Sequence, residues 1–202
     1  MSPLRSPNFR GQKAVILHRE DENINRLTRH LDRLGMESTI RWPDLSMPTD
    51  QFDVLYFDGD NGHDDLFPWP KGAPTVPLIA MIGSEAPGRL EWVLSHNSSA
   101  HLIKPVQSSG VFSTLVIAYS NFERQRLEAC KLEALEHRIA QRPAVFRALL
   151  SIIDASGLDD EAAFGILRFG AMSRRQSIED FCGQLDKRRA AALVHTYRAG
   201  QG

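Results

Sequence analysis

The sequence predicts an α/β protein built from a flavodoxin-like five-stranded parallel sheet, a long coiled-coil-like helix and a small module of three helices. Short apolar runs alternate with amphipathic stretches over the first half of the chain, which is typical of a sheet covered by helices. Residues 111–139 then contain no proline or glycine. After residue 142, helical patterns are separated by capping residues. We therefore expect a sheet domain at 11–110, a linker and dimerisation helix at 111–141, and a helical domain at 142–202.

Length and composition exclude several classes of protein. With 202 residues, of which 42% are hydrophobic, the chain can bury a core of ordinary size. Its first eleven residues lack the apolar segment of a signal peptide, and no run approaches the ~18 apolar residues of a membrane helix. Cys130 and Cys182 match no zinc or redox spacing, so we expect two reduced, buried thiols. We expect a cytoplasmic protein with no membrane partner, no cofactor and no catalytic site.

Apolar runs and helical spacing identify the elements of the sheet domain. The expected strands are, in order, 13–18, 38–41, 52–57, 77–82 and 100–103. A helix is expected at 23–34, because Ile24, Leu27 and Leu31 recur at helical spacing and Gly35 follows as a stop. A shorter helix is expected at 90–95. Strands that alternate with helices in this order predict a doubly wound parallel sheet.

Polar residues at the ends of these strands carry the first functional signal. Asp58 follows the third strand and Lys104 follows the fifth, and on these positions the domain resembles a two-component receiver domain. The resemblance implies a phosphoacceptor at Asp58, a carboxylate pair for Mg²⁺ after the first strand and a hydroxyl after the fourth. Instead, His18 and Arg19 occupy the first position and Ile82 the second. We expect a degenerate receiver in which Asp58 and Lys104 form a structural ion pair, with control by phosphorylation of Asp58 as the alternative.

The loop after the third strand, residues 60–65, contains one histidine among clustered acids. Turn-forming residues surround them, which is typical of a solvated connection. A metal site is not expected here, because no second histidine or ordered ligand spacing is present.

The long helix carries apolar residues at heptad-like spacing. Two seven-residue series run along it, and polar residues decorate the other faces. We expect a homodimer joined along this helix, and the alternative is a helix that folds back on its own sheet domain. The residues expected at the dimer seam are Leu115, Phe122, Ala129, Leu132 and Ile139.

The last third of the chain is predicted to form three helices, with capping or helix-stop residues between them. A helix over 144–155 ends at Gly157, whose position suits a left-handed cap. Asp159 is placed to cap the second helix, and residues 177–180 resemble a capping box that opens the third. A further basic helix is expected over 186–198.

This C-terminal pattern resembles the ANTAR domain, the RNA-binding output domain of AmiR/NasT-type transcription antitermination regulators. The resemblance rests on Arg142, Ala148, Gly157, Glu161, Ala162, Phe164, Leu167, Ala171, Met172, Arg175 and Ile178. It implies a dimeric regulator that binds paired stem-loops in a leader transcript, so RNA rather than DNA is the expected partner. By analogy, a ligand-sensing protein partner is a further expectation, because a receiver that lacks its Mg²⁺ ligands needs another input.

Charge and aromatic residues indicate where RNA would bind. Residues 1–137 hold 14 Lys and Arg against 18 Asp and Glu, whereas residues 138–202 hold 10 against 7. The expected RNA contacts are Arg142, Arg147, Arg168, Arg174 and Arg175, with the first two about one turn apart on one helix. Phe164 and Phe169 are candidate stacking surfaces, although helical spacing favours a core position for Phe164.

One departure from the family pattern supports a second hypothesis. Where the family commonly has Lys-Gly after the alanine matched by Ala148, this chain has Leu149 and Leu150. The helix becomes apolar on nearly every side, which is typical of a helix buried against a partner. The alternative function is therefore a protein-interaction regulator that has lost RNA binding.

Overall fold

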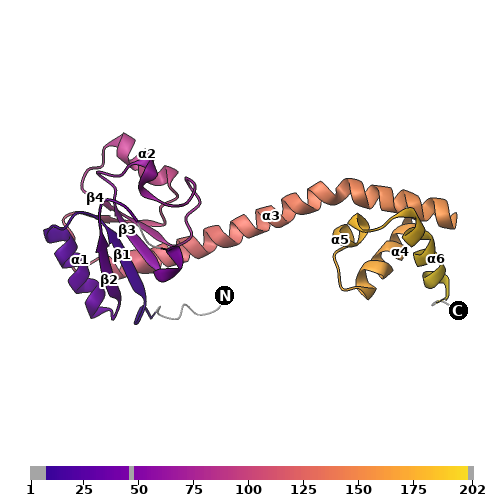
Figure 1. Ribbon diagram of the computed structural model, residues 1–202, viewed down its shortest axis with the longest axis horizontal. Helices are drawn as coiled ribbons and strands as arrows, with labels where there is room; N and C mark the ends of the chain where they lie inside the picture. Colours follow the sequence, from indigo (N-terminus) through magenta and orange to yellow (C-terminus); the bar gives the residue numbers. More distant parts are fainter. Residues whose placement is uncertain (1–7, 46–47, 200–202) are drawn as a thin grey trace. The chain divides into compact units, whose positions relative to one another are not determined.

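The computed structural model describes residues 8–45 and 48–199 and divides into two compact units, Met1–Leu127 and Glu128–Gly202 (Figure 1). The boundary falls inside one helix, α3 (Val111–Ser156), which contributes to both units.

The first unit contains the predicted parallel sheet. Its strands are β1 (Lys13–Leu17), β2 (Glu37–Arg41), β3 (Val54–Asp58), β4 (Leu78–Ile82) and β5 (Ala100–Ile103). They lie in the order β2-β1-β3-β4-β5, and every neighbouring pair is parallel. All residues of β3 and β4 are buried, which explains why the sequence shows these strands as unbroken apolar runs. The predicted flavodoxin-like fold is confirmed.

Alternate residues of β1, β3 and β4 enter two separate cores. Tyr56 of β3 packs with Ile24 of α1 (Glu22–Arg33) and with Leu115 of α3 on one face of the sheet. Phe57, the next residue, packs on the other face with Val93 of α2 (Pro87–Ser95). Side chains that alternate along a strand account for this separation.

The sequence named helices only at 23–34 and 90–95, and two other connections of the sheet contain no α-helix in the part of the chain that the structure describes. Between β2 and β3 and between β3 and β4, the described residues form only single 3-10 turns, η1 (Thr49–Gln51) and η2 (Asp64–Leu66). Proline-rich and glycine-rich sequence in both segments does not support an α-helix. Loop residues such as Leu66 and Phe67 cover this face in place of helices.

The helix after β5 is longer than the sequence predicts. We expected a break near residue 142 and a new helix from residue 144, but α3 continues through Pro143 to Ser156. Ala148 and Ile152, which follow the proline, are buried in the core of the second unit, and this packing offsets the cost of Pro143. Cys130 lies on this helix and is exposed, so the prediction of a buried thiol is wrong for Cys130 and right for Cys182.

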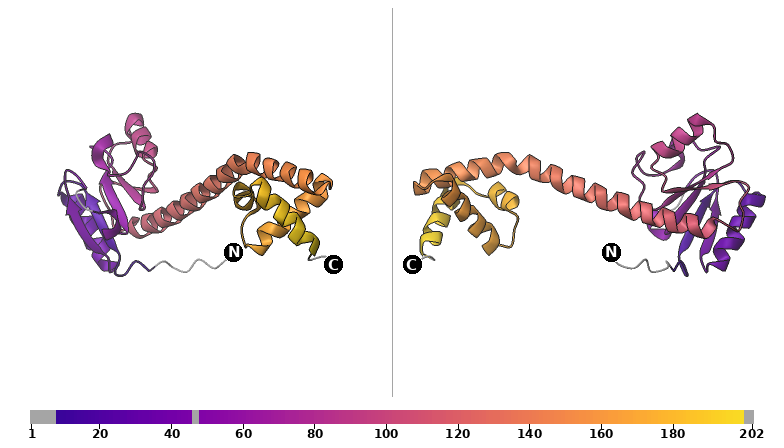
Figure 2. Two further views of the ribbon diagram at one scale, coloured as in Figure 1. Left: turned by 45° about the vertical axis from the view of Figure 1, so that its right-hand side comes forward. Right: turned by 180° about the vertical axis from the view of Figure 1, so that it is seen from behind.

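The second unit packs three helices on one side of the last turns of α3 (Figure 2). They are α4 (Asp160–Ser173), α5 (Ile178–Gly183) and α6 (Lys187–Ala199). Ile152, Ile166 and Phe181 lie at the centre of the common core.

Predicted caps set the boundaries of the helices in the second unit. Asp159 accepts a hydrogen bond from the Ala162 amide, and Ser177 accepts one from the Asp180 amide. Gly157 has a φ of 67°, as expected for a left-handed stop. Among the described residues, no helix has the length and apolar character needed to cross a membrane.

Candidate functional site

A buried charge network occupies the receiver-like site at the carboxyl ends of β1, β3 and β5. Lys104 Nζ lies 3.0 Å from Asp58 Oδ1, which confirms the predicted ion pair. His18 Nε2 lies 3.4 Å from Asp58 Oδ2 and 3.2 Å from Lys104 Nζ. Nδ1 of His18 donates to the Arg19 carbonyl at 2.6 Å, so in the neutral ring Nε2 is left as an acceptor for Lys104.

Asp60 completes this network, and the sequence did not predict its role. Its Oδ2 lies 2.7 Å from Lys104 Nζ, and its carboxylate also accepts from the amides of Gly83 at 2.9 Å and Ser84 at 3.0 Å. Asn61 Nδ2 donates to Asp58 Oδ2 at 2.8 Å. Sequence pattern placed Asp60 in a solvated loop because its partners lie after a different strand, more than twenty positions along the chain.

The network shifts the pKa values of its members in opposite directions. Burial alone would raise the pKa of Asp58, but hydrogen bonds from Asn61 and Lys104 hold that pKa below its ordinary value. Hydrogen bonds from Lys104 and from the amides of Ser84 and Gly83 likewise outweigh burial and lower the pKa of Asp60. Burial would lower the pKa of Lys104, but its two carboxylate partners raise it.

These residues do not fit a Mg²⁺ ion. Both oxygens of Asp58 already have hydrogen-bond or ionic partners, and the Lys104 ammonium lies within 3.0 Å of carboxylates of both Asp58 and Asp60. A hard divalent cation needs several free oxygens, whereas His18 and Arg19 follow β1. Arg19 instead lies over the Trp42 ring, with 5.2 Å from its Cζ to the ring centroid. Ile82, the last residue of β4, offers no hydroxyl.

The acidic loop after β3 is ordered by specific contacts rather than being only a solvated connection. Asp64 accepts a hydrogen bond from Trp92 Nε1 at 2.8 Å and lies 3.4 Å from Lys71 Nζ. Gly62 packs against the Trp92 ring so closely that a Cβ there would lie 2.1 Å from it. No cluster of three or more His, Cys, Asp or Glu residues suited to a metal ion occurs in the described parts of the chain.

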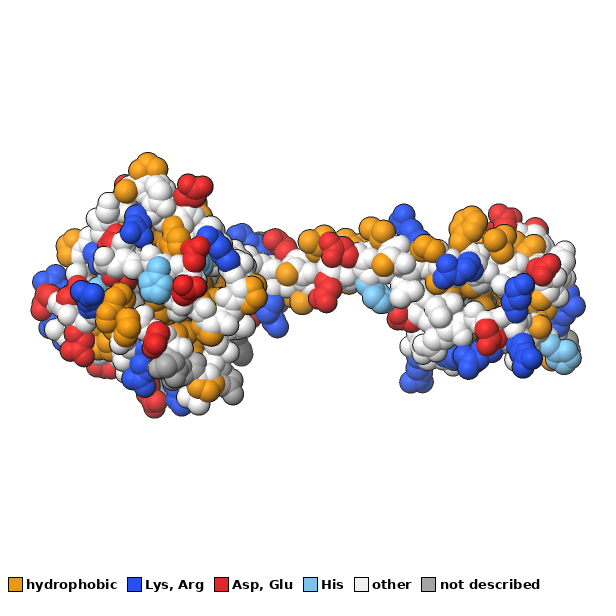
Figure 3. Space-filling model, turned by 45° about the horizontal axis from the view of Figure 1, so that its top comes forward, with side chains coloured by type: hydrophobic (Ala, Val, Ile, Leu, Met, Phe, Trp, Pro, Cys, Tyr) orange, Lys and Arg blue, Asp and Glu red, His pale blue; other side chains and the backbone are white. Residues whose placement is uncertain are grey.

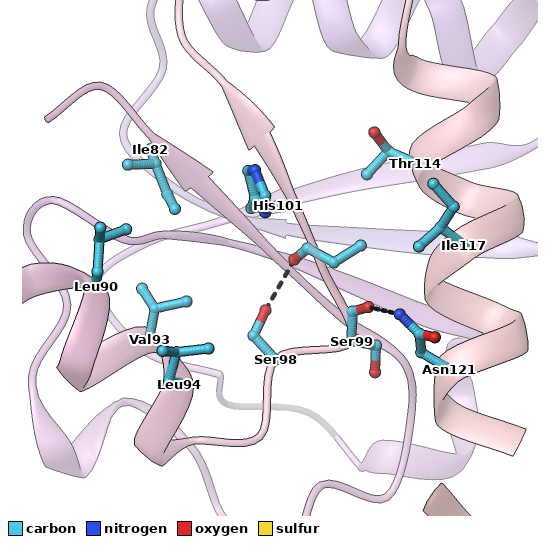
Figure 4. Close-up of a pocket in the computed structure, with 11 residues that line it drawn as sticks. Ile82, Leu90, Val93, Leu94, Ser98, Ser99, His101, Thr114, Ile117 and Asn121 are labelled. Carbon is cyan, nitrogen blue, oxygen red and sulfur yellow. Dashed lines mark hydrogen bonds between the residues drawn. The ribbon is translucent and has the colours of Figure 1, made fainter. Parts of the chain in front are cut away.

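A groove of about 420 Å³ lies at the edge of the sheet between α2, β5 and α3 (Figure 4). Its walls are mainly apolar and include Leu90, Leu94 and Ile117. Side chains cap the carbonyls along this edge, since Ser98 Oγ donates to Ala100 O at 2.8 Å and Asn121 Nδ2 donates to Ser99 O at 2.8 Å.

All five arginines predicted to contact RNA are exposed in the second unit. Figure 3 shows Lys and Arg side chains gathered on its surface. Arg174 and Arg175 end α4, and Arg174 lies over the Phe181 ring at 5.3 Å. Arg142 and Arg147, expected about one turn apart, lie on different faces of the helix, because five helical positions separate them by about 140°. Of these two, Arg142 alone lines the groove of about 460 Å³ that also contains Arg138, Phe164 and Glu179.

Both phenylalanines of α4 reach the surface. Phe164 is 39% exposed and Phe169 is 41% exposed, so the expectation of a core position for Phe164 is wrong. The residues of α4 that lie in the core include Ala163, Ile166 and Leu167. Phe164 has helical spacing to this set but lies at its margin, where the groove beside α3 begins.

An apolar stripe runs along α3 and only partly matches the predicted dimer seam. Leu115 is fully buried in the first core, so it is unavailable to a partner helix, and Phe122 is half-buried. Ala129, Leu132 and Ile139 are exposed as expected. Further exposed apolar residues, which the predicted seam did not include, continue the three-and-four spacing. They are Leu135, Phe146 and Leu150.

Comparison with known proteins identifies the family. The family model described as AmiR, N-terminal, matches residues 12–119, whereas no curated protein matches the chain. Among solved structures, full-length FixJ from B. japonicum is similar at 14% identity and a TM-score of 0.44, covering 96% of this chain and 99% of FixJ. A CheY-like response regulator from Mesorhizobium loti is similar at 21% identity and a TM-score of 0.40, covering 54% of this chain and 98% of that protein. Since the family model spans more than half of its residues, the chain belongs to the AmiR family of regulators.

Proposed function

We propose that this receiver-containing regulator binds RNA as a dimer and acts in transcription antitermination in the cytoplasm. The observation that carries the proposal is the cationic surface of the second unit. Residues 162–178 contain Arg168, Arg174 and Arg175, all exposed, and no acidic residue. Exposed cations beside exposed aromatic rings are the groups that bind RNA phosphates and unpaired bases.

Control by phosphorylation of Asp58 does not fit the charge network. Lys104, Asn61 and His18 already contact the Asp58 carboxylate, and the residues around it do not suit Mg²⁺. A protein partner or another signal would therefore set the activity. Incubation with a small phosphodonor and Mg²⁺ should leave the intact mass unchanged, and the gain of one phosphoryl group would support the phosphorylation hypothesis instead.

The stripe on α3 supports the dimer. Leu132, Leu135, Ile139 and Phe146 follow the alternating spacing of three and four residues that joins two helices in a coiled coil. Each of them is more than half exposed within a single chain. Pairing with a second copy would remove this apolar surface from water.

The decisive experiment measures binding to a labelled RNA that carries two tandem stem-loops, across a salt series. Arg174→Ala/Arg175→Ala is the test variant, and Arg29→Ala/Arg33→Ala, two exposed arginines of α1, is the matched control. We expect saturable binding that weakens as salt rises and that falls only in the test variant. Equal RNA affinity of both variants and the wild type would show that Arg174 and Arg175 do not contact the RNA.

A second function is favoured by the apolar residues near the end of α3. Phe146 is 67% exposed and Leu150 is 55% exposed, although their neighbours Ala148 and Ile152 are buried. A regulator that acts by docking on another protein would use such a surface. Folded, dimeric protein that binds no RNA at low salt would favour this function over antitermination.

A further inference from the structure

Three hydrogen-bond donors from two different segments converge on the carboxylate of Asp60. Lys104, directly after β5, places its Nζ 2.7 Å from Oδ2. The amides of Gly83 and Ser84, which follow β4, donate to Oδ2 at 2.9 Å and to Oδ1 at 3.0 Å. Successive backbone amides together with an ammonium group are donors that bind small oxyanions in proteins. The carboxylate of Asp60 is therefore held as a bound anion would be.

Gly83 allows this close approach. A Cβ at residue 83 would lie 2.9 Å from Asp60 Oδ2, which is too close for two non-bonded atoms, and 3.5 Å from Lys104 Cε. Gly83 is not among the glycines with positive φ, so the backbone conformation does not require glycine. Glycine is required here because it leaves room for the carboxylate.

The segment between β4 and α2 depends on these bonds for its position. Residues 83–86 are exposed at every position. Among the described residues, Asp60 is the only hydrogen-bond partner of the Gly83 and Ser84 amides. Because α2 begins directly afterwards at Pro87, the same bonds fix the point at which the chain enters this helix.

Asp60 differs in this respect from Asp58. Asp58 is almost completely buried, whereas Asp60 is partly exposed and reaches donors more than twenty positions further along the chain. Burial opposes ionisation of Asp60, but hydrogen bonds from Lys104 and from the two amides hold its pKa below the ordinary value. The carboxylate is therefore charged near neutral pH and can serve as the anion.

We propose that Asp60 is a built-in ligand of the segment between β4 and α2, and that its carboxylate fills an oxyanion site formed by Lys104 and the amides of Gly83 and Ser84. The segment is thereby held at all times in the arrangement of an occupied site, with no external anion. A small oxyanion such as inorganic phosphate enters only when the Asp60 carboxylate is removed. This inference concerns the first unit and does not depend on the proposed RNA binding.

The test compares Asp60→Ala with Asp65→Ala in the full chain. Asp65 is an exposed acid of the same loop whose carboxylate has no hydrogen bond or ion pair within the described structure, so it is a matched control. Asp60→Ala should lower the Tm by roughly 3–6 °C, because the amides lose a charged acceptor. Inorganic phosphate should restore about half of this loss, measured against chloride at equal ionic strength. The wild type and Asp65→Ala should show no such gain.

Nuclear magnetic resonance of the ¹⁵N-labelled protein observes the two amides directly. The amide proton resonances of Gly83 and Ser84 should move upfield in Asp60→Ala, since a hydrogen bond to a carboxylate is lost, and should return downfield as phosphate is added. In Asp60→Asn the side chain still fills the site, so phosphate should move neither resonance. If the two amides of Asp60→Ala respond to phosphate no more than those of the wild type, the proposal is wrong.

Gly83→Ala tests the same contact with Asp60 in place. Its Cβ should push the carboxylate away, lower the Tm and move the Ser84 amide resonance upfield. In the Asp60→Ala background the added cost of Gly83→Ala should largely disappear, because the nearest remaining atom is Lys104 Cε at 3.5 Å. An equal cost in both backgrounds would show that the carboxylate is not what requires glycine at residue 83, and would also overturn the proposal.

Discussion

Lys104 balances two carboxylates that would otherwise repel each other. Its ammonium lies 3.0 Å from Asp58 and 2.7 Å from Asp60, and Asp58 is almost completely buried. Removing one partner of a buried pair leaves an uncompensated charge, which costs more than the pair itself contributes. The sheet domain therefore depends on Lys104 for stability, even though no phosphoryl transfer is assigned to it.

Lys104→Met should lower the free energy of unfolding by about 3–5 kcal/mol near neutral pH. Asp58→Asn should cost less, because Lys104 keeps Asp60 as a partner at 2.7 Å. Urea unfolding of the full chain measures both values. Equal losses in the two variants would contradict the assignment of Lys104 as the centre of the network.

The lowered carboxylate pKa values and the raised Lys104 pKa fix the pH dependence of this contribution. Stabilisation by Asp58 and Asp60 is complete above their unfolded pKa of about 4 and is lost as pH falls through the lowered folded values. The stabilisation contributed by Lys104 is complete below its unfolded pKa of about 10.4 and is lost as pH rises through its folded pKa. The stability difference between the wild type and Lys104→Met should therefore shrink below about pH 4. A difference that stays constant down to pH 2 would contradict this account.

Gly62 is required by packing rather than by backbone conformation. Because a Cβ would lie 2.1 Å from the Trp92 ring, Gly62→Ala should destabilise the protein by about 1–3 kcal/mol. Near-ultraviolet circular dichroism should also change, since the Trp92 ring must move. Gly88→Ala serves as the control without a clash. An unchanged Tm in Gly62→Ala would show that the loop can shift away at no cost.

At the level of elements, α3 has two different apolar faces that sequence spacing alone could not separate. Leu115 and Leu132 have the same residue type and fall into similar series, yet Leu115 is buried in the first core and Leu132 is 58% exposed. Periodicity shows that a face is apolar but not what covers it. Only the packing of the sheet shows that the apolar residues in the first turns of α3 are already buried in the first core.

Ile139→Asp should dissociate the proposed dimer, because it places a charge in the centre of the exposed stripe. Ala140→Asp, turned about 100° around the helix, should not. Sedimentation at micromolar concentration gives the oligomeric state, and far-ultraviolet circular dichroism should show the same helix content in both variants. Leu115→Ala is the contrasting change, and we expect it to lower the free energy of unfolding by about 2–5 kcal/mol without dissociation. If the wild-type protein is a monomer at this concentration, the proposal of a dimer joined along α3 is wrong.

Strands were predictable from the sequence because each is a short apolar run with turn residues on both sides. All five lie within two residues of their predicted bounds at either end. No helix was assigned between β2 and β3 or between β3 and β4, and the described residues have only η1 and η2 there. Prolines and glycines in both segments disfavour an α-helix. Continuation of α3 through Pro143 depends on contacts of Ala148 and Ile152 with the rest of the second unit, which no local pattern reports.

At the scale of the whole molecule, the two units have separate hydrophobic cores. Leu55 and Tyr56 belong to the cores of the sheet, whereas Ile166 and Phe181 belong to the core of the helical unit. Between them, residues 128–140 of α3 are exposed at every position. An exposed helical segment contributes little tertiary packing through which one core could stabilise the other.

We therefore expect the full chain to unfold in two thermal transitions rather than one. Leu55→Ala and Ile166→Ala each remove a fully buried side chain, and each should cost about 2–5 kcal/mol in its own unit. Differential scanning calorimetry should show that each variant lowers the temperature of a different transition and leaves the other in place. A single transition lowered by both variants would mean that α3 couples the two cores into one cooperative unit. In that case, a change at the receiver-like site could reach the second unit through folding stability alone.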